Sequence, residues 1–309
     1  MQQHTKLSGQ YRAVITRAGE VVKDSGWFDN LILNQGLDRI GQDDTLAVIT
    51  HCHIGTGTVA PANTDTGLGT FVTATTIPGS TSRTNSGTPL YKTEITYTGT
   101  FAQGAVVGNM TEVGIGWAVS GANLFSRSLI VDGGGTPTAL TVTSIDQLTI
   151  YYKLTFIPVL TDSTGSVVLA GITYNYTARV AQVANSFASG STFTYPGYGL
   201  IGTYGNSTTC SFSNSTGVLG PVTGVPTNIV TDVPYKISTN AAYSAGNYYR
   251  DCAIALTTTE ANVSGGIGAM SVTFGKGAFN HFAQYQFTPP IPKDNTKTLS
   301  LTFRISWSR

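Results

Sequence analysis

The triplet His51-Cys52-His53 has residue types that could bind a metal ion. Successive side chains of a β-strand point to opposite faces, so His51 and His53 would share one face and Cys52 the other. Two imidazoles are too few ligands for a closed zinc site within one chain. A three-fold axis could bring the imidazoles of three chains together, whereas in one chain both histidines would line a strand pair or a subunit contact. His51 and His53 are therefore weak metal candidates, and we expect no cofactor.

Residues that could carry catalysis are sparse. The chain has 4 His and no Gly-x-Ser-x-Gly elbow, so a Ser-His-Asp nucleophile has no support. Glycoside cleavage needs two acids in one cleft, but Asp65 and Glu112 belong to acids in turn-like or cap-like contexts. The segments Gly55-Thr56-Gly57 and Gly114-Ile115-Gly116 lack the lysine and the following helix of a phosphate-binding loop. We predict that the protein is not an enzyme.

Aromatic residues in loop-like segments could instead contact a ligand. The candidates for contact with a glycan or a partner protein are Tyr195, Tyr198, Tyr204, Tyr248 and Tyr249. Exposed tyrosines suit such contacts because the ring is apolar and the hydroxyl can form hydrogen bonds. The same rings could equally fill the core beneath long loops. Both interpretations remain open at the level of the sequence.

Composition favours an ordered β-rich chain with few charges. Charged residues make up 11% of the 309 residues, against about a quarter in ordinary globular proteins. The chain still has 15 Tyr, 13 Phe and 36 Gly, which suits strands and turns better than disorder. The net charge is +1, and no Lys/Arg run could follow a nucleic-acid backbone. We expect no nucleic-acid partner, no membrane span and no secretory signal at the N-terminus.

One strand pattern occurs twice and organises the predicted fold. Residues 148–156 and 299–307 both alternate apolar and polar positions, and they match one another in step, for example Tyr152 with Phe303 and Lys153 with Arg304. A period of two is typical of a strand with one buried face. We interpret each copy as the last strand of a β-sandwich. A single larger sheet system that ends in similar strands is the alternative.

These patterns predict an all-β protein made of two β-sandwich (jelly-roll-like) modules, and a duplication of one module could explain the matching strands. The predicted modules are residues 1–158 and 159–309, the second with a Ser/Thr/Asn/Gly-rich insertion at about 162–225. At most one short helix is expected, at residues 34–41, with Asn34 as its N-cap. Three cysteines without a secretory signal argue against a disulfide framework, although a bridge between Cys210 and Cys252 is possible.

Several stretches resemble virion structural proteins of tailed bacteriophages. They are residues 26–37; His53-Ile54-Gly55-Thr56-Gly57 with Pro61 and Thr64-Asp65-Thr66; Thr111-Glu112-Val113-Gly114-Ile115-Gly116-Trp117 followed by Asn123-Leu124-Phe125-Ser126-Arg127; and Pro290-Ile291-Pro292-Lys293 with residues 299–307. Together they look like a family of tail, neck or fibre-associated proteins. The resemblance covers most of residues 10–157 and about the last forty, whereas residues 160–265 match nothing. These turn and strand signatures indicate a fold and a class of protein, not a catalytic site.

The resemblance implies a non-enzymatic structural subunit that forms a homo-oligomer, as a ring, trimer or hexamer, and contacts other tail, neck or capsid proteins. The first module would dock to the particle. An uncharged surface suits large subunit contacts, and the missing secretory signal suits assembly in a bacterial host cytoplasm followed by location in the virion. A receptor-binding or capsid-decoration module that recognises a host surface glycan is the alternative. An enzyme that degrades a surface polysaccharide is the third hypothesis.

Overall fold

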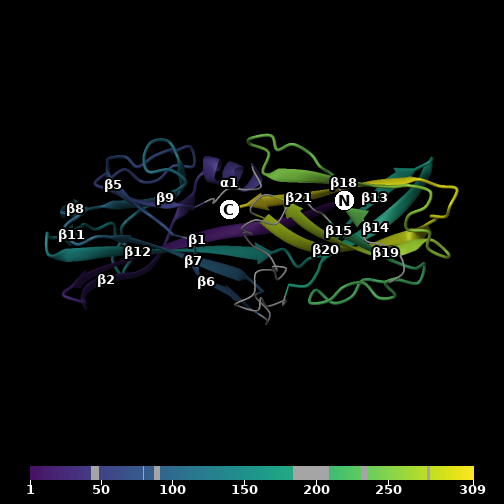
Figure 1. The fold of residues 1–309 in the computed structure, drawn as a ribbon, viewed down its shortest axis with the longest axis horizontal. Helices are drawn as coiled ribbons and strands as arrows, with labels where there is room; N and C mark the ends of the chain where they lie inside the picture. Colours follow the sequence, from purple (N-terminus) through teal and green to yellow (C-terminus); the bar gives the residue numbers. More distant parts are fainter. Residues whose placement is uncertain are drawn as a thin grey trace.

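The computed structural model describes residues 1–42, 49–78, 80–86, 91–183, 209–230, 236–237, 239–276 and 279–309. Over these residues the chain forms an elongated stack of β-sheets with one helix, α1 (Asn34–Gly41), near the middle of the long axis (Figure 1). The predicted all-β, sandwich-type fold with a single short helix is therefore confirmed. Within the described residues, no helix has the length and apolar character needed to cross a membrane.

The largest sheet has eight strands. They are β1 (Gln2–Arg17), β2 (Glu20–Asp29), β6 (Ser80–Asn85), β7 (Thr93–Phe101), β12 (Asp146–Pro158), β17 (Thr239–Asn240), β18 (Tyr249–Leu256) and β21 (Leu299–Ser308). Their order is β17-β18-β21-β1-β12-β7-β6, and β2 also pairs with β1. Strand β1 runs along the long axis through the middle of the molecule (Figure 1).

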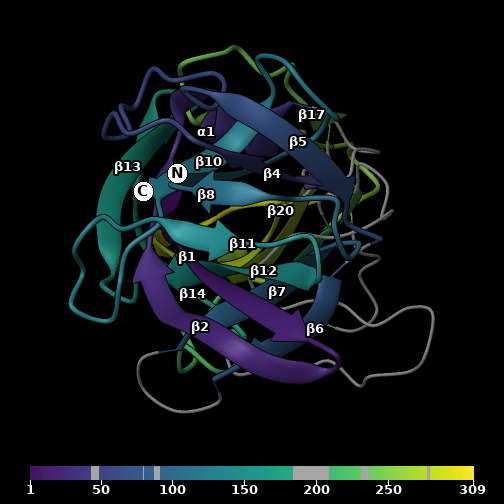
Figure 2. The ribbon, with the colours of Figure 1, turned by 90° about the vertical axis from the view of Figure 1, so that its left-hand side faces the viewer.

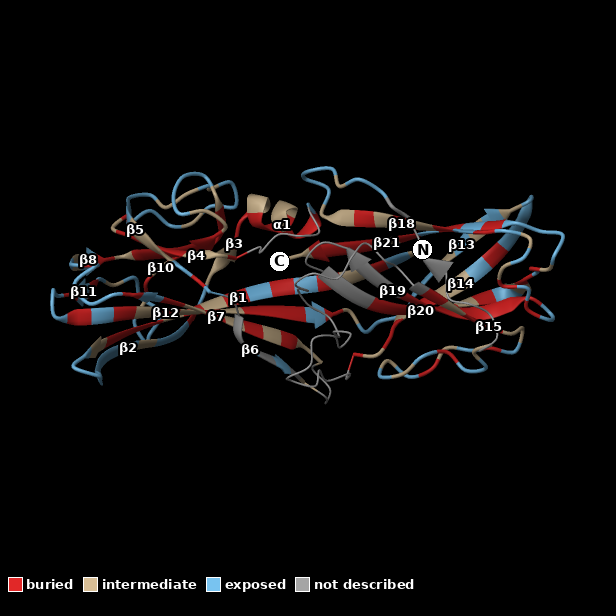
Figure 3. Ribbon diagram, in the orientation of Figure 1, coloured by how far each residue is buried: buried red, intermediate tan, exposed pale blue. Residues whose placement is uncertain are grey.

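The two matching strands of the sequence lie on either side of β1. Strand β12 pairs with β1 antiparallel over residues 5–17, and β21 pairs with β1 parallel over residues 2–6. Over residues 148–156 of β12 and 299–307 of β21 the alternating apolar positions are buried and most of the polar ones are not, as the alternation predicted (Figure 3). The eight-stranded sheet thus contains strands from both sides of residue 158. The division into modules 1–158 and 159–309, and their origin by duplication, stay predictions.

A five-stranded sheet covers one end of the large sheet. It contains β3 (Leu31–Ile32), β4 (His51–Gly55), β5 (Phe71–Thr76), β9 (Glu112–Gly116) and β10 (Leu124–Leu129), in the order β3-β10-β9-β4-β5. The end view shows β4, β5 and β10 above β1, β7 and β12 (Figure 2). Buried aromatic residues join the layers: the Tyr11 hydroxyl lies 2.7 Å from Ser126 Oγ, and the Phe125 and Tyr152 rings meet edge to face. A short pair, β8 (Gly108–Met110) and β11 (Leu140–Val142), closes this end.

A six-stranded sheet covers the other end. Its strands are β13 (Ser163–Leu169), β14 (Ile172–Val180), β15 (Thr209–Ser213), β16 (Lys236–Ile237), β19 (Ile267–Lys276) and β20 (Phe279–Ile291). The order is β13-β14-β20-β19-β15-β16. Tyr285 of β20 packs on Phe303 of the large sheet, with ring centroids 5.0 Å apart. The start of the Ser/Thr/Asn/Gly-rich region is therefore a regular hairpin in a sheet, and residues 184–208 of that region lie outside the described residues.

Helix α1 spans the predicted residues 34–41, but its N-cap differs from the predicted one. Leu33 is the N-cap, because its carbonyl accepts the first helical hydrogen bond from Leu37 N at 3.0 Å. Asn34 is already helical, and its side-chain oxygen accepts a hydrogen bond from Arg309 Nη2 at 2.8 Å. The prediction of Asn34 as the N-cap is therefore wrong, since this side chain binds the distant C-terminal residue. Leu37 and Ile40, three positions apart, lie on the buried face of the helix.

Contacts around α1 tie the helix to the loop before β18 and to the end of β21. Asp38 Oδ1 accepts hydrogen bonds from the Tyr243 hydroxyl and from Gly246 N, both at 2.6 Å. Trp307 Nε1 donates to Leu37 O at 2.9 Å, and the Trp307 ring stacks on Tyr243. Gly41 lies so close to both rings that a Cβ atom there would come within 2.4 Å of Tyr243. The helix therefore joins segments more than two hundred residues apart.

Candidate functional site

A loop at residues 56–70 covers the outer face of the five-stranded sheet, opposite the large sheet. Every residue of β9 is buried, although a strand with one solvated face would alternate. The inner face packs Val113 and Ile115 into the core, and the loop covers the outer face that carries Glu112. The sequence places an acid, Glu112, and a base, Arg127, on neighbouring strands of this outer face. These two side chains hold the loop.

The Glu112 carboxylate accepts four hydrogen bonds at the centre of this site. Its Oε1 atom accepts from Gly57 N at 2.8 Å and from Thr70 N at 2.7 Å. Its Oε2 atom accepts from Gly69 N at 3.0 Å and from Arg127 Nε at 3.0 Å. Glu112 is fully buried, so these donors replace the water that an ionised carboxylate requires. One side chain thus fixes both ends of the loop.

The Arg127 guanidinium extends the same network toward the surface. Its Nη1 atom donates to Asp65 Oδ2 at 2.5 Å, and its Nη2 atom donates to Val59 O at 2.9 Å. The Arg127 side chain is 3% exposed and that of Asp65 is 26% exposed. The buried base therefore links a fully buried acid to a half-buried one, and it holds the middle of the loop. We refer to Asp65, Glu112 and Arg127 as the loop clamp.

The close approach of the loop requires glycine. A Cβ atom at Gly57 would lie 2.3 Å from Glu112 Oε1, a distance that real Cβ atoms do not reach. Any side chain at this position would push the loop away from the carboxylate. The Gly55-Thr56-Gly57 segment, which lacks the lysine of a phosphate-binding loop, therefore serves the contact between loop and clamp.

His51 and His53 lie beside this network on β4. The Cys52 side chain points to the opposite face of the strand, toward Gly99 of the large sheet, as the alternation predicted. His53 is 1% exposed, and its Nε2 atom lies 2.7 Å from the Ala118 carbonyl oxygen. A carbonyl only accepts, so Nε2 carries the proton. Burial lowers the pKa of His53, and the nearby His51 lowers it further, against the opposing effect of the hydrogen bond to Ala118. His53 is therefore neutral at pH 7.

Acidification should destabilise the fold through His53. Because its folded pKa lies below the usual value near 6.5, its stabilising contribution is present above about pH 6.5 and is lost as the pH falls below it. We expect His53→Gln, which can still donate to the Ala118 carbonyl, to make the free energy of unfolding less dependent on pH between about 7 and 5. Urea unfolding across this range measures the slope. Burial also lowers the pKa of His4, so the pH dependence of the free energy of unfolding is measured for His4→Gln as well, for comparison with His53→Gln. Identical slopes for wild type and His53→Gln would contradict the prediction.

A pocket of about 530 Å³ opens beside the loop clamp. Its walls include His53, residues 64–69, Phe71, Gly121 and Arg127. The Phe71 ring is 43% exposed and meets the His53 ring edge to face at 5.5 Å. Asp65 uses its Oδ2 atom for Arg127 and for Ala62 N. The pocket therefore presents an aromatic ring beside a carboxylate whose position is fixed by a buried arginine.

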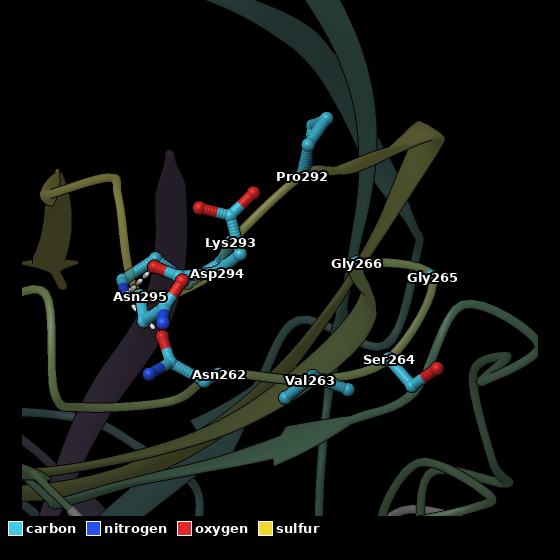
Figure 4. Close-up of a pocket in the computed structure, with 9 residues that line it drawn as sticks. All are labelled: Asn262, Val263, Ser264, Gly265, Gly266, Pro292, Lys293, Asp294 and Asn295. Carbon is cyan, nitrogen blue, oxygen red and sulfur yellow. Dashed lines mark hydrogen bonds between the residues drawn. The ribbon is translucent and has the colours of Figure 1, made fainter.

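A second pocket, of about 680 Å³, lies at the opposite end between the turn at 262–266 and the loop at 292–295 (Figure 4). The Lys293 Nζ atom donates to Asn262 Oδ1 at 2.7 Å and to the Asp294 carbonyl oxygen at 3.1 Å. Burial lowers the pKa of Lys293, whereas the nearby Asp294 and Glu260 raise it. The ammonium group therefore joins two loops.

The clamp is arranged for anchoring and not for proton transfer. Each oxygen of Glu112 already accepts two hydrogen bonds, so neither is left to hold a proton for a substrate.

Among the residues that the structure describes, no three His, Cys, Asp or Glu side chains are grouped as metal ligands. All three cysteines are buried and free, so Cys210 and Cys252 do not form the bridge that the sequence left possible.

The predicted tyrosine contacts fall in two places. Tyr195, Tyr198 and Tyr204 lie outside the described residues. Tyr248 and Tyr249 are half-buried: the Tyr248 carbonyl accepts a hydrogen bond from Trp307 N at 2.9 Å, and the Arg304 guanidinium lies 3.6 Å from the centre of the Tyr249 ring. Both of these therefore have contacts within the chain, and their role toward a glycan or partner stays a prediction.

The sequence did not predict the loop clamp, because Asp65 and Glu112 resembled separate acids in turn-like or cap-like contexts and nothing paired them with Arg127. The available signal was an acid and a base on consecutive strands of a low-charge chain, at positions that would otherwise be buried and apolar.

Comparisons with protein-family models, with curated protein sequences and with solved structures found no match for this chain.

Proposed function

We propose that the chain is a non-enzymatic structural subunit of a tailed-phage virion, in the tail, the neck or a fibre attachment. In this role it forms a homo-oligomer, as a ring, trimer or hexamer, and contacts other tail, neck or capsid proteins. It assembles in the bacterial host cytoplasm and ends in the virion. The observation that carries this proposal is the way in which the phage-like stretches come together around the loop clamp.

Three of those stretches supply parts of one structural unit. The stretch at 53–66 supplies Asp65 and the loop, the stretch at 111–117 supplies Glu112, and the stretch at 123–127 supplies Arg127. Residues 26–37 contribute β3, which pairs with β10 beside the clamp. Stretches that are separated in the sequence thus come together in one packed unit. This supports the interpretation that they resemble phage proteins in fold, and not only in the pattern of single strands.

The outer face of the large sheet also suits subunit contacts. Thr96, Thr98 and Thr100 of β7 lie opposite Lys153, Tyr151 and Thr149 of β12 on the face turned away from the core. Four of these six side chains are threonines and one is a tyrosine. The charged side chains on the same face have partners there: Lys153 lies 3.9 Å from Glu94, and the Arg12 guanidinium lies over the Tyr151 ring. The centres of protein interfaces are depleted in charged residues. A face on which uncharged side chains predominate and the charges are partnered therefore favours burial against a neighbouring subunit.

Location in a particle tests this proposal. Particles released from cells that express the chain from its native genome are separated from free protein on a density gradient. We expect the chain to sediment with the particles, and immunogold labelling to mark one region of the tail or neck in negative-stain images. A chain found only in the unassembled fraction, with no oligomer formed on adding other virion proteins, would contradict the proposal.

Recognition of a host surface glycan is the second candidate, and the pocket beside the clamp is the observation that favours it. Sugar-binding sites combine an aromatic ring that faces the sugar with polar groups that fix its hydroxyls. Phe71 at the start of β5 provides the ring, and Asp65 and Thr66 provide polar groups on the loop that the clamp holds in place. A receptor-binding or capsid-decoration module would use such a pocket.

Glycan-array binding tests the second candidate. We expect Phe71→Ala to abolish binding, because it removes the exposed ring, with little loss of stability. The matched control is Val72→Ala on the same strand, which is 42% exposed and does not line the pocket. Equal binding by Phe71→Ala and wild type, or no binding by wild type to any glycan, would exclude this pocket as the receptor site.

A further inference from the structure

Strand β13 forms one edge of the six-stranded sheet. It pairs with β14 in an unbroken register, from Ser163 opposite Ala178 to Leu169 opposite Ile172. Among the described strands, β14 is its sole partner in the sheet. In the end view β13 lies at the outer margin of the molecule (Figure 2). Every second backbone N–H and C=O group of β13 therefore points away from the sheet, where another strand could pair.

This edge lacks the features that usually prevent strands from pairing between molecules. The sequence Ser163-Thr164-Gly165-Ser166-Val167-Val168-Leu169 has no charged residue and no proline, and its register has no bulge. Natural edge strands are usually shortened, bulged, or protected by lysine, inward-pointing charges or proline. On the outer face of β13 the apolar Val168 side chain is also 64% exposed.

Strand β2 shows how the same chain protects an edge. It carries Glu20, Lys23 and Asp24, and two register shifts interrupt its pairing with β1. Its exposed Trp27 lies beneath the Lys153 ammonium, 4.3 Å from the ring centre. Charges and bulges of this kind oppose addition of a further strand. The difference between β2 and β13 is therefore one of chemistry and not only of position.

We propose that β13 is a self-association edge, at which a second copy of this chain adds its own β13 antiparallel about a two-fold axis. The occupant must be an extended strand, because backbone groups form the surface that is offered. A second copy fits because the segment is uncharged and so does not repel itself, and because a two-fold contact is closed and self-complementary. The two six-stranded sheets would then continue into one another across the axis.

An axis through Ser166 pairs all seven residues of both strands. Thr164 of one copy would lie opposite Val168 of the other, on the exposed face, and Ser166 would lie opposite itself. A strand of this length is about 23 Å long, at roughly 3.3 Å per residue. The exposed Val168 side chain of each copy adds apolar area near both ends of the contact.

Sedimentation velocity of the purified full chain over a concentration series tests this contact. We expect a monomer–dimer equilibrium for wild type, and at least about fivefold weaker association for Ser166→Lys, because two like charges would meet on the axis. Ser166→Glu should weaken association in the same way. Mixing the two variants should restore it, because the opposite charges then meet. Val22→Lys on β2 is the matched control and should associate like wild type.

Three results would overturn the contact: a wild-type chain that stays monomeric, Ser166 variants that associate normally, or a mixture that does not recover. Ser166 is exposed, and circular dichroism of each variant checks that the fold is kept. The inference shares with the proposed function only self-association. A monomeric chain that still sediments with particles would reject the β13 contact alone, and a dimeric chain absent from particles would reject the virion role alone.

Discussion

Replacing Glu112 with Ala should lower the free energy of unfolding by about 3–5 kcal/mol, because it removes the fully buried partner of an ion pair and leaves the buried Arg127 guanidinium with only the half-buried Asp65 as its acidic partner. Arg127 is 3% exposed and would lose Glu112, its most deeply buried partner. The backbone N–H groups of Gly57, Gly69 and Thr70 would lose their acceptor at the same time. Chemical denaturation measures the loss.

A second variant separates charge from shape at this position. Glu112→Gln keeps the volume but replaces one acceptor oxygen with an amide NH₂ group, which would face N–H donors. We therefore expect Glu112→Gln to be destabilising as well, although it leaves no cavity. The control is Asp162→Ala, which breaks the surface pair with Arg179, where both side chains are about one-third exposed, and should change stability by less than about 1 kcal/mol. Equal effects of Glu112→Ala and Asp162→Ala would show that the clamp does not hold the loop.

Replacing Phe303 with Asp should prevent stable folding. Phe303 is fully buried on β21 and packs on Tyr285 between the large and the six-stranded sheets. A carboxylate at this position would have to be buried without a partner, or the two sheets would have to separate to admit water. We expect insoluble protein, or soluble protein without a cooperative unfolding transition. Expression tests and thermal unfolding distinguish these outcomes.

The neighbouring residue provides a strict control for this prediction. Thr302 lies on the same strand but points to the exposed face, so Thr302→Asp places the same carboxylate in water. Its effect should be limited to the weaker strand propensity of Asp, within about 1 kcal/mol. A Phe303→Asp variant that folds and assembles as Thr302→Asp does would show that the alternation of β21 has been misinterpreted.

Alternation could be predicted because it depends only on neighbours in the chain. The buried positions of β12 and β21 follow from a period of two, and the buried face of α1 follows from the spacing of Leu37 and Ile40. Some local signals are compatible with more than one structure. Asn34 has the residue type of an N-cap, but its side chain accepts a hydrogen bond from Arg309. The Ser/Thr-rich start of the second half has the composition of a linker, but it forms the β13–β14 hairpin.

The candidate site depended on contacts that no local pattern contains. Glu112 binds Gly57, which is 55 positions away, and Arg127 binds Asp65, which is 62 positions away. In the sequence Asp65 and Glu112 read as separate acids in turns. Their partners become visible only once β9 and β10 pair and the loop folds back over them.

Taken by itself, the sequence determined the all-β class, the short helix at residues 34–41, the paired strand patterns and the lack of charge, because composition and periodicity act locally. Tertiary structure decided that strands from both halves share one sheet around β1, and that the His51-Cys52-His53 triplet lies beside a loop clamp with no third ligand among the described residues. The physical reason is that pairing of distant strands and burial of an ion pair depend on which residues meet in space. Only the fold sets those distances.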